Sequence, residues 1–195
     1  MNTKKQIFID KAVFGPLARL LNVFVRIAGK ILFIDHSLQQ DFKTIAVCKF
    51  KGMGSIIQST PMLKALRQRF PNAEIIYVST EANRKILEQI TLIDTIITVN
   101  DRSFFSSLIG SFKSIFILIR KKPEVYIDLE IYSNFSTIFT TLTLSKNRIG
   151  FYLRSSSFRM GIYTHMMFFN PRMPVSEVYL QIARLFGNFE KSPEI

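Results

Sequence analysis

An alternation of short apolar runs with longer amphipathic stretches begins at Thr44 and constrains the fold more than any other feature of the sequence. Each apolar run is rich in β-branched residues, has the length of a buried strand and is bounded by turn or polar residues. Strands are predicted at 44–49, 74–79, 95–99 and 125–129, with a weaker fifth at 147–151. Helices are predicted at 55–70, 82–90, 103–121, 134–144 and 175–187. Because strands and helices that alternate in this way form right-handed crossover units, we expect an α/β domain with a Rossmann-like parallel sheet and helices on both faces.

The N-terminal part of the chain does not follow this alternation. We therefore divide the sequence into an amphipathic helical segment, 1–40, and a Rossmann-like domain, 41–195. Residues 7–34 are largely apolar but contain no uninterrupted apolar stretch of about 18 residues, so a membrane-spanning helix is not expected. A signal peptide is not expected either, because no small-residue cleavage site follows a compact apolar block. We predict an amphipathic helix over 11–34, started or kinked by Pro16.

The polar residues of this predicted helix gather on one side. They fall within an arc of roughly 100° on a helical wheel. They are Lys11, Arg19, Asn22, Arg26, Gly29 and Lys30. A narrow cationic stripe beside a broad apolar face suits a helix that lies in the plane of an anionic membrane surface. The alternative is a helix that packs on the body of its own protein or against a missing domain, and the sequence leaves both interpretations open.

Charge and composition limit the classes of partner. The formal net charge of +12 favours anionic partners, although an AT-rich genome also raises the Lys content. The basic residues are scattered and no helix-turn-helix, zinc-finger or RNP-type signature is present, so nucleic acid is not an expected partner. The single cysteine, Cys48, cannot form an internal disulfide, which fits a reducing cytoplasm. With two histidines and one cysteine, no zinc site of the usual spacing can be assembled.

A glycine turn follows the first predicted strand and is the most informative stretch for function. The strand ends at Lys49, the turn carries Gly52 and Gly54, and a helix opens near Ser55. Open α/β sheets bind ligands outside the carboxyl ends of their strands, and a helix N-terminus there offers free N–H groups to an anion. Two glycines are neither the three-glycine dinucleotide fingerprint nor a P-loop, so a tight structural turn is the alternative interpretation.

The sequence around this turn resembles the opening of the heptosyltransferase family, glycosyltransferase family nine. Lys49 stands where the family has Arg, and the following residues are in register with its motif: Gly54, Thr60, Pro61, Leu63, Ala65, Leu66, Phe70 and Pro71. Three later blocks also resemble the family in the same order, at 125–139, 147–155 and 163–171. The resemblance extends over roughly residues 43–188.

The resemblance implies the N-terminal, acceptor-side half of a GT-B glycosyltransferase, whose C-terminal donor-binding domain is absent from this chain. The implied donor is a nucleotide sugar, ADP-heptose or a similar compound, bound by the missing domain, with no metal or other cofactor. The implied partners are an anionic glycolipid acceptor of the lipopolysaccharide core, the inner-membrane surface and a separate C-terminal half. We accordingly expect a cytoplasmic protein peripheral to the inner membrane and inactive alone. The alternatives are a non-catalytic module that binds anionic lipid or glycan and, more weakly, another nucleotide-binding α/β protein.

In this family an Asp directly after the last glycine is the favoured general base, and here that position is Ser55. An unactivated hydroxyl is a poor base, so Ser55 is expected to cap the helix instead. The candidate substitutes are Asp128 and Glu130 at the carboxyl end of another strand, where alternation places both on one side. The alternative is that Asp128 stabilises the strand end while Glu130 is solvated.

The candidate acceptor-binding residues are basic side chains and glycines near the predicted sheet edge. They are Lys49, Lys51, Gly52, Gly54 and Arg154. Lysines at this position suit acceptor phosphates, with ordinary surface charge as the alternative. Arg148 and Arg159 are weaker candidates of the same kind.

Overall fold

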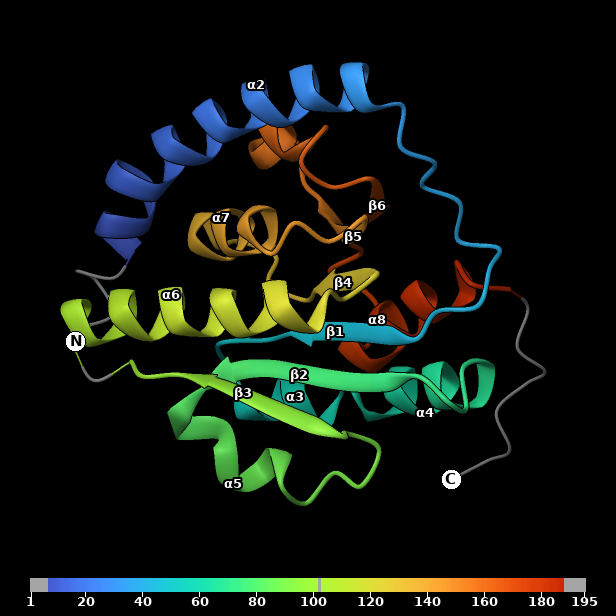
Figure 1. Ribbon diagram of the computed structural model, residues 1–195. Helices are drawn as coiled ribbons and strands as arrows, with labels where there is room; N and C mark the ends of the chain where they lie inside the picture. Colours follow the sequence, from blue (N-terminus) through green and yellow to red (C-terminus); the bar gives the residue numbers. More distant parts are fainter. Residues whose placement is uncertain (1–6, 102, 188–195) are drawn as a thin grey trace.

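The computed structural model describes residues 7–101 and 103–187, which form a six-stranded, wholly parallel sheet with helices on both faces (Figure 1). The strand order is β3-β2-β1-β4-β5-β6. The strands are β1 (Thr44–Cys48), β2 (Glu74–Thr80), β3 (Thr95–Val99), β4 (Val125–Asp128), β5 (Asn147–Tyr152) and β6 (His165–Phe168). The predicted fold class is confirmed, and the strand order is that of Rossmann-type folds.

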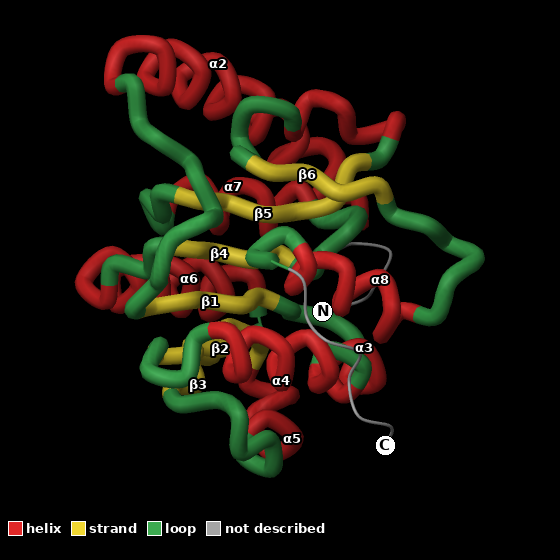
Figure 2. Tube along the Cα trace, turned by 90° about the vertical axis from the view of Figure 1, so that its right-hand side faces the viewer, coloured by secondary structure: helices red, strands yellow, loops and turns green. Residues whose placement is uncertain are grey.

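Helical crossovers connect successive strands. They are α3 (Met53–Ile57), α4 (Thr60–Arg69), the 3₁₀-helix η2 (Glu81–Asn83), α5 (Arg84–Leu87), α6 (Phe104–Lys121), α7 (Asn134–Leu142) and the 3₁₀-helix η3 (Arg154–Arg159). Helix α8 (Val175–Arg184) follows β6. Helices α6 and α7 cover one face of the sheet, and α3, α4 and α8 cover the other (Figure 2).

Alternating side chains of the strands supply two separate cores. Ile45 and Val47 of β1 belong to the core on the α4 and α8 side, together with Leu63 and Leu66 of α4. Ala46 and Cys48 point to the opposite core, on the side of α6 and α7. Because both faces are apolar, the strand reads as a continuous apolar run in the sequence, as is usual for parallel sheets covered on both sides.

Three elements differ from the predicted boundaries. The predicted helix 55–70 is wrong as a single helix, because the chain turns at Gln58 and Ser59 and Pro61 lies in the first turn of the separate helix α4. The predicted helix 82–90 is a 3₁₀ turn followed by the one-turn helix α5. Strand β6 was not predicted, because it is an edge strand whose side chains are half-buried or exposed and do not form a buried apolar run.

The N-terminal segment is helical from Ile7 to Leu32. A π-helical turn, η1 (Asp10–Phe14), precedes the regular helix α2 (Gly15–Leu32), and Pro16 stands in the first turn of α2. Helix α2 lies outside the sheet layers, against α7 and η3 (Figures 1 and 2). By length and composition this helix is able to cross a membrane. Residues 1–6 and 188–195, at the outer ends of the two predicted segments, lie outside the described residues.

Candidate functional site

The strand order changes direction between β1 and β4, because the chain runs outward from β1 to β2 and β3 and then returns to β4 on the other side. Ligands bind outside the carboxyl ends of the strands at such a switch point. A cavity of about 750 Å³ lies at this edge. Its polar lining includes Asp10, Lys51, Asn83, Asp101, Glu130 and Ser133. Within residues 7–101 and 103–187, no group of three or more His, Cys, Asp or Glu side chains is arranged to hold a metal ion.

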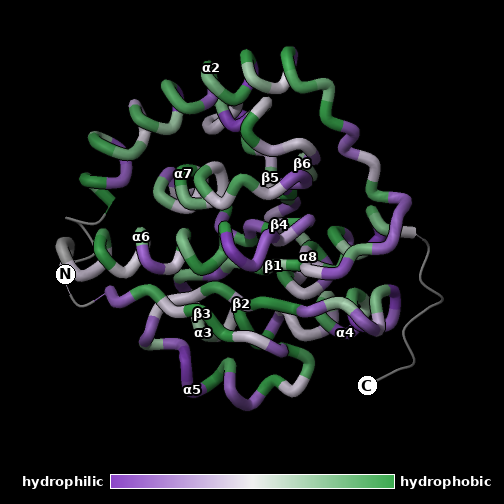
Figure 3. Tube along the Cα trace, viewed as in Figure 1, coloured by the Kyte–Doolittle hydropathy of each residue, from purple (hydrophilic) through white to green (hydrophobic). Residues whose placement is uncertain are grey.

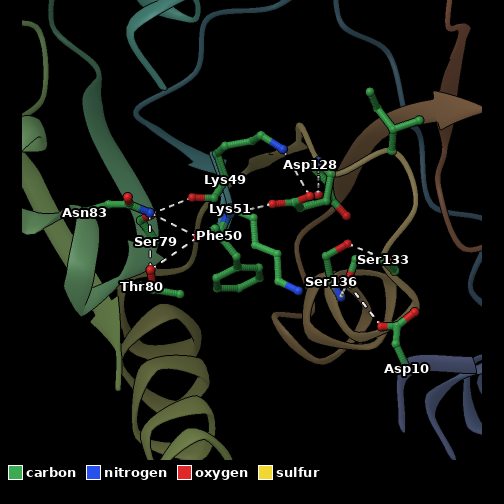
Figure 4. A network of polar contacts seen from close by, with 12 residues as sticks. Asp10, Lys49, Phe50, Lys51, Ser79, Thr80, Asn83, Asp128, Ser133 and Ser136 are labelled. Carbon is green, nitrogen blue, oxygen red and sulfur yellow. Dashed lines mark hydrogen bonds and ion pairs between the residues drawn. The ribbon is translucent and has the colours of Figure 1, made fainter. Parts of the chain in front are cut away.

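The glycine turn after β1 is held by side chains from the end of β2 and from the 3₁₀-helix η2 that follows it. Gly52 has a φ of 89°, which favours glycine, and is the N-cap of α3. The Ser79 hydroxyl donates to the carbonyl of Lys49 at 2.5 Å, and Asn83 Nδ2 donates to the carbonyl of Phe50 at 3.0 Å (Figure 4). Neighbouring strand ends therefore fix the path of the backbone into the cavity wall.

Glu130 joins the loop after β4 to the turn after β1. Its Oε2 lies 3.0 Å from the Nζ of Lys49, and its Oε1 accepts the backbone N–H groups of Phe50 at 2.9 Å and Lys51 at 2.8 Å. Lys49 and Glu130 are each 7% exposed. A buried ion pair is tolerated when further hydrogen bonds compensate the lost hydration, as the two backbone donors do here. Glu130 is therefore not the solvated side chain of the alternative interpretation.

Asp128 is fully buried and does not line the cavity. Its carboxylate accepts the hydroxyl of Tyr163 at 2.6 Å, the hydroxyl of Thr140 at 3.3 Å and the backbone N–H of Glu130 at 2.8 Å. Burial raises the pKa of Asp128 above its ordinary value, while the Arg159 guanidinium and the hydrogen bonds from Tyr163 and the backbone of Glu130 oppose the rise. The hydrogen bond to Glu130 turns the chain out of the strand, so the two carboxylates face different partners.

Ser55 lies within α3, whose N-cap is Gly52, so the expectation that Ser55 caps this helix is wrong. Its side chain hydrogen-bonds instead with Tyr179 of α8, and it is not part of the cavity lining. Burial raises the pKa of Tyr179 to about 12, and the hydrogen bond with Ser55 opposes that rise. At the position of the family base, the structure therefore has a contact between two helices.

The predicted acceptor-binding residues are separated by the fold. Lys51 and Gly52 line the cavity. Lys49 is buried and its ammonium group is paired with Glu130. Gly54 in α3 and Arg154 beyond β5 are exposed and lie outside the cavity lining.

Arg159 is completely buried, and its side chain hydrogen-bonds to the loop that follows β4. Its guanidinium donates to the carbonyl oxygens of Glu130 at 3.2 Å, Ile131 at 2.9 Å and Ser133 at 2.6 Å. It therefore positions the backbone that carries Glu130 into the cavity. Arg148, the other weaker candidate, donates to backbone carbonyls near β5 and β6 and does not line the cavity.

Asp10 is a cavity residue that was not predicted from the sequence. Its carboxylate accepts the backbone N–H groups of Asn134 at 3.0 Å and Phe135 at 2.9 Å. It also accepts the hydroxyl of Ser133 at 3.3 Å (Figure 4). It thus places a negative charge on the N-terminus of α7, where the helix dipole favours one. No local signal reveals this contact, because its partners lie 123 to 125 positions away along the chain.

No family model matches this sequence, and no curated protein matches it. Solved structures do match. The glycosyl transferase family 9 structure from Veillonella parvula DSM 2008 is 21% identical with a TM-score of 0.70, covering 81% of this chain and 45% of that chain. E. coli heptosyltransferase WaaC with ADP is 15% identical with a TM-score of 0.63, covering 78% and 49%. E. coli ADP-heptose lps heptosyltransferase II is 18% identical with a TM-score of 0.60, covering 72% and 40%.

These similarities confirm the expected resemblance to glycosyltransferase family nine at the level of the fold. The chain spans about half the length of each of these structures. The four sequence blocks that carry the resemblance lie at β1 to α4, at β4 to α7, at β5 and at β6. They therefore include the two strand ends that meet at the switch point.

Proposed function

We propose that this chain is the acceptor-binding, N-terminal domain of a heptosyltransferase-like glycosyltransferase. Such an enzyme transfers a sugar from a nucleotide sugar, ADP-heptose or a similar compound, to a lipopolysaccharide core or a related surface glycan. The observation that carries the proposal is the cavity at the switch point of a fold shared with part of known glycosyltransferases. Lys51 in the cavity lining and the net charge of +12 suit an anionic acceptor. The proposed location is the cytoplasm, which agrees with the free thiol of Cys48.

The donor-binding half is proposed to come from a C-terminal domain or a separate chain, because this chain spans only about half of its structural neighbours. The chain alone is expected to be inactive, since positioning both substrates together supplies much of the rate of a transfer reaction.

Sugar transfer from ADP-heptose to heptose-free lipopolysaccharide tests this proposal. Transfer is measured with the purified 195-residue chain and with a joined protein, in which the donor-binding half follows this chain. We expect transfer only from the joined protein. Robust transfer by the 195-residue chain would contradict the need for a donor half. A joined protein that binds ADP-heptose but transfers nothing would contradict the enzymatic proposal.

Glu130 is the proposed general base, because it lines the cavity whereas Asp128 is sealed beneath α7. General base help is typically worth about 10²–10⁴-fold, so Glu130→Gln in the joined protein should lower turnover at least about tenfold. Ser55→Ala should change turnover little, because Ser55 contacts Tyr179 and is not part of the cavity lining. Asp128→Asn should have a smaller effect than Glu130→Gln.

Because Glu130 also holds the glycine turn, its variant needs a structural control. Ser79→Ala removes a different hydrogen bond to the same turn and leaves the carboxylate in place. A base role predicts that Glu130→Gln lowers turnover at least about tenfold while Ser79→Ala changes it little. Equal losses from Ser79→Ala and Glu130→Gln would show that Glu130 only positions the turn.

A non-catalytic module that binds anionic lipid or glycan is the second candidate. It is favoured by the observation that both carboxylate oxygens of Glu130 are already engaged and that Ser55 contacts Tyr179. This candidate predicts binding of heptose-free lipopolysaccharide by the chain, no transfer by the joined protein, and no effect of any of these variants on turnover.

A further inference from the structure

Helix α2 is attached to the protein by its polar side and turns its apolar side outward. The residues of α2 that are buried are Gly15, Ala18 and Asn22, which form one stripe along the helix. The opposite side exposes a continuous set of large apolar residues: Val13, Leu17, Leu20, Val23, Phe24, Ile27, Ile31 and Leu32. Figure 3 shows that hydrophobic residues recur along this outlying helix, with hydrophilic residues between them. Leu20 is 55% exposed and Phe24 is 60% exposed, so the body of the protein does not cover this face.

The polar contact that fixes α2 is close and specific. Asn22 Nδ2 donates to the carbonyls of Phe158 and Met160, and Arg26 Nη2 donates to the carbonyl of Met160 at 2.6 Å. Gly161 follows this loop with a φ of 102°, and a Cβ added there would lie 2.6 Å from Arg26 Nε. A glycine at this position therefore permits an approach that a side chain would block.

The charges around the apolar face are of one sign. Lys11 and Lys30 are exposed near the two ends of the helix. The sole carboxylate between residues 7 and 34 is that of Asp10, which is already bound at the N-terminus of α7. An exposed apolar face with cationic ends and no unengaged carboxylate is complementary to an anionic lipid surface.

We infer that the exposed apolar face of α2 is a docking surface for an anionic membrane, and that the helix lies in the membrane plane while its polar side holds the α/β domain. The membrane contact is made by the apolar residues, with Lys11 and Lys30 at its margins. Arg26, which was expected to face the lipid, is instead used to hold the domain.

Two other placements fit the contacts less well. A helix that crossed the membrane would have to break the hydrogen bonds of Asp10, Asn22 and Arg26 to the domain. A second domain that contacts the cavity would meet the N-terminal end of the helix, where Ile7 and Phe14 line the cavity. The 18 residues of α2 extend the apolar face by about 27 Å beyond that end.

The docked helix also places the cavity close to the membrane. Asp10, Lys11 and Phe14 belong both to the N-terminal helix and to the cavity lining. An acceptor anchored in the same membrane would therefore enter beside this helix, a consequence that rests on the proposed function. The docking itself needs neither a donor nor an acceptor.

Flotation of the full 195-residue chain with vesicles of phosphatidylethanolamine and phosphatidylglycerol tests the inference. The double variant Leu20→Glu/Phe24→Glu alters the docking face. The control Leu144→Glu/Phe168→Glu makes the same change of charge at two exposed apolar positions outside α2. We expect the first pair to lower vesicle partitioning at least about tenfold and the control pair to change it less than about twofold. Thermal unfolding of both variants shows whether they remain folded.

Several outcomes would overturn docking by this face. They are no binding by the wild-type chain, equal loss in both pairs, or a wild-type chain that remains in the vesicles after an alkaline carbonate wash, which indicates a spanning helix. A lipid-free dimer that the Leu20→Glu/Phe24→Glu variant dissociates would assign the face to a second copy. Loss of vesicle binding without loss of sugar transfer to a soluble acceptor would separate this inference from the proposed function.

Discussion

Helices α4 and α2 have amphipathic sequences of similar kind but opposite orientations in the structure. In α4, Leu63 and Leu66 are completely buried against the sheet, and Lys64 is exposed. In α2, the buried residues are the small Gly15 and Ala18 and the polar Asn22, whereas the large apolar Leu20 and Phe24 face away from the domain. An amphipathic pattern therefore shows that two faces differ in polarity, but it does not show which face the rest of the protein covers.

The surfaces that receive the two helices explain the difference. Helix α4 follows β1 after the glycine turn and the short helix α3, and it covers an apolar face of the sheet. Helix α2 precedes β1 by the loop 33–43 and packs outside α7, where the sheet is already covered. The groups available there are the carbonyls of Phe158 and Met160 and the N-terminus of α7, which bind polar side chains.

The largest expected difference between the two helices is in core stability. Leu66→Ala in α4 should lower the free energy of unfolding by about 2–5 kcal/mol, because it leaves a cavity in the core. Leu20→Ala in α2 should change it by less than about 0.5 kcal/mol, since that side chain is already exposed. Urea denaturation of both variants measures the difference. A large loss from Leu20→Ala would show that the outward face of α2 is covered in solution.

The next prediction concerns the polar attachment of α2. The double variant Asn22→Ala/Arg26→Ala should weaken the local attachment of the helix by about 1–3 kcal/mol, because it leaves carbonyl acceptors unpaired. Hydrogen exchange should become faster in α2 while the sheet remains protected. Lys30→Ala, at an exposed position of the same helix, serves as the control and should leave exchange unchanged. Slow exchange in the double variant would mean that other contacts hold the helix.

Removal of Asp10 should have an effect of about 1 kcal/mol, comparable to the loss of a helix cap. Asp10→Ala deletes the carboxylate that accepts the N–H groups of Asn134 and Phe135. Asp35→Ala, which removes an exposed carboxylate bound to a backbone N–H in a loop, provides the comparison. Thermal unfolding should show a loss for Asp10→Ala only. Equal effects would mean that Asp10 contributes nothing to the connection between the N-terminal helix and α7.

The smallest expected effect is on the pH dependence of the unfolding free energy, and it comes from the buried carboxylate of Asp128. Burial raises the pKa of Asp128 in the folded protein, so the native state binds its proton more tightly than the unfolded state. The unfolding free energy should therefore decrease as pH rises from the ordinary Asp range through the raised value, and then level off. Denaturation of wild type and Asp128→Asn between about pH 4 and pH 8 measures this, and the variant should lack the decrease. Identical profiles would show that Asp128 ionises as it does in the unfolded chain.

The sequence predicted the sheet well because each strand signal is local. Ile45 and Val47 face one core and Ala46 and Cys48 face the other, so the whole run is apolar whichever partners it has. Strand β6 could not be predicted in this way, because an edge strand needs fewer apolar residues. The glycine turn was found at the carboxyl edge for the same local reason, since Gly52 must adopt a positive φ there.

The site was predicted only in part. Asp128 and Glu130 were both predicted as candidate bases, and both lie at the carboxyl end of β4. The strand ends at Asp128, whose carboxylate accepts the backbone N–H of Glu130, so the alternation does not continue to Glu130. The ion pair between Lys49 and Glu130 joins residues 81 positions apart in the sequence. Register between β1 and β4 creates that contact, and no local pattern specifies this register.

The sequence by itself determined the alternation of strands and helices, the parallel sheet, the glycine turn and the amphipathic character of the N-terminal helix. These follow from the spacing of neighbouring residues along the chain. Tertiary structure alone decided that Glu130 pairs with Lys49, that Asp10 binds the N-terminus of α7 and that α2 presents its apolar face outward. Each of these depends on which polar or apolar group lies opposite in space, and residues that lie opposite in this fold are separated by many positions in the chain.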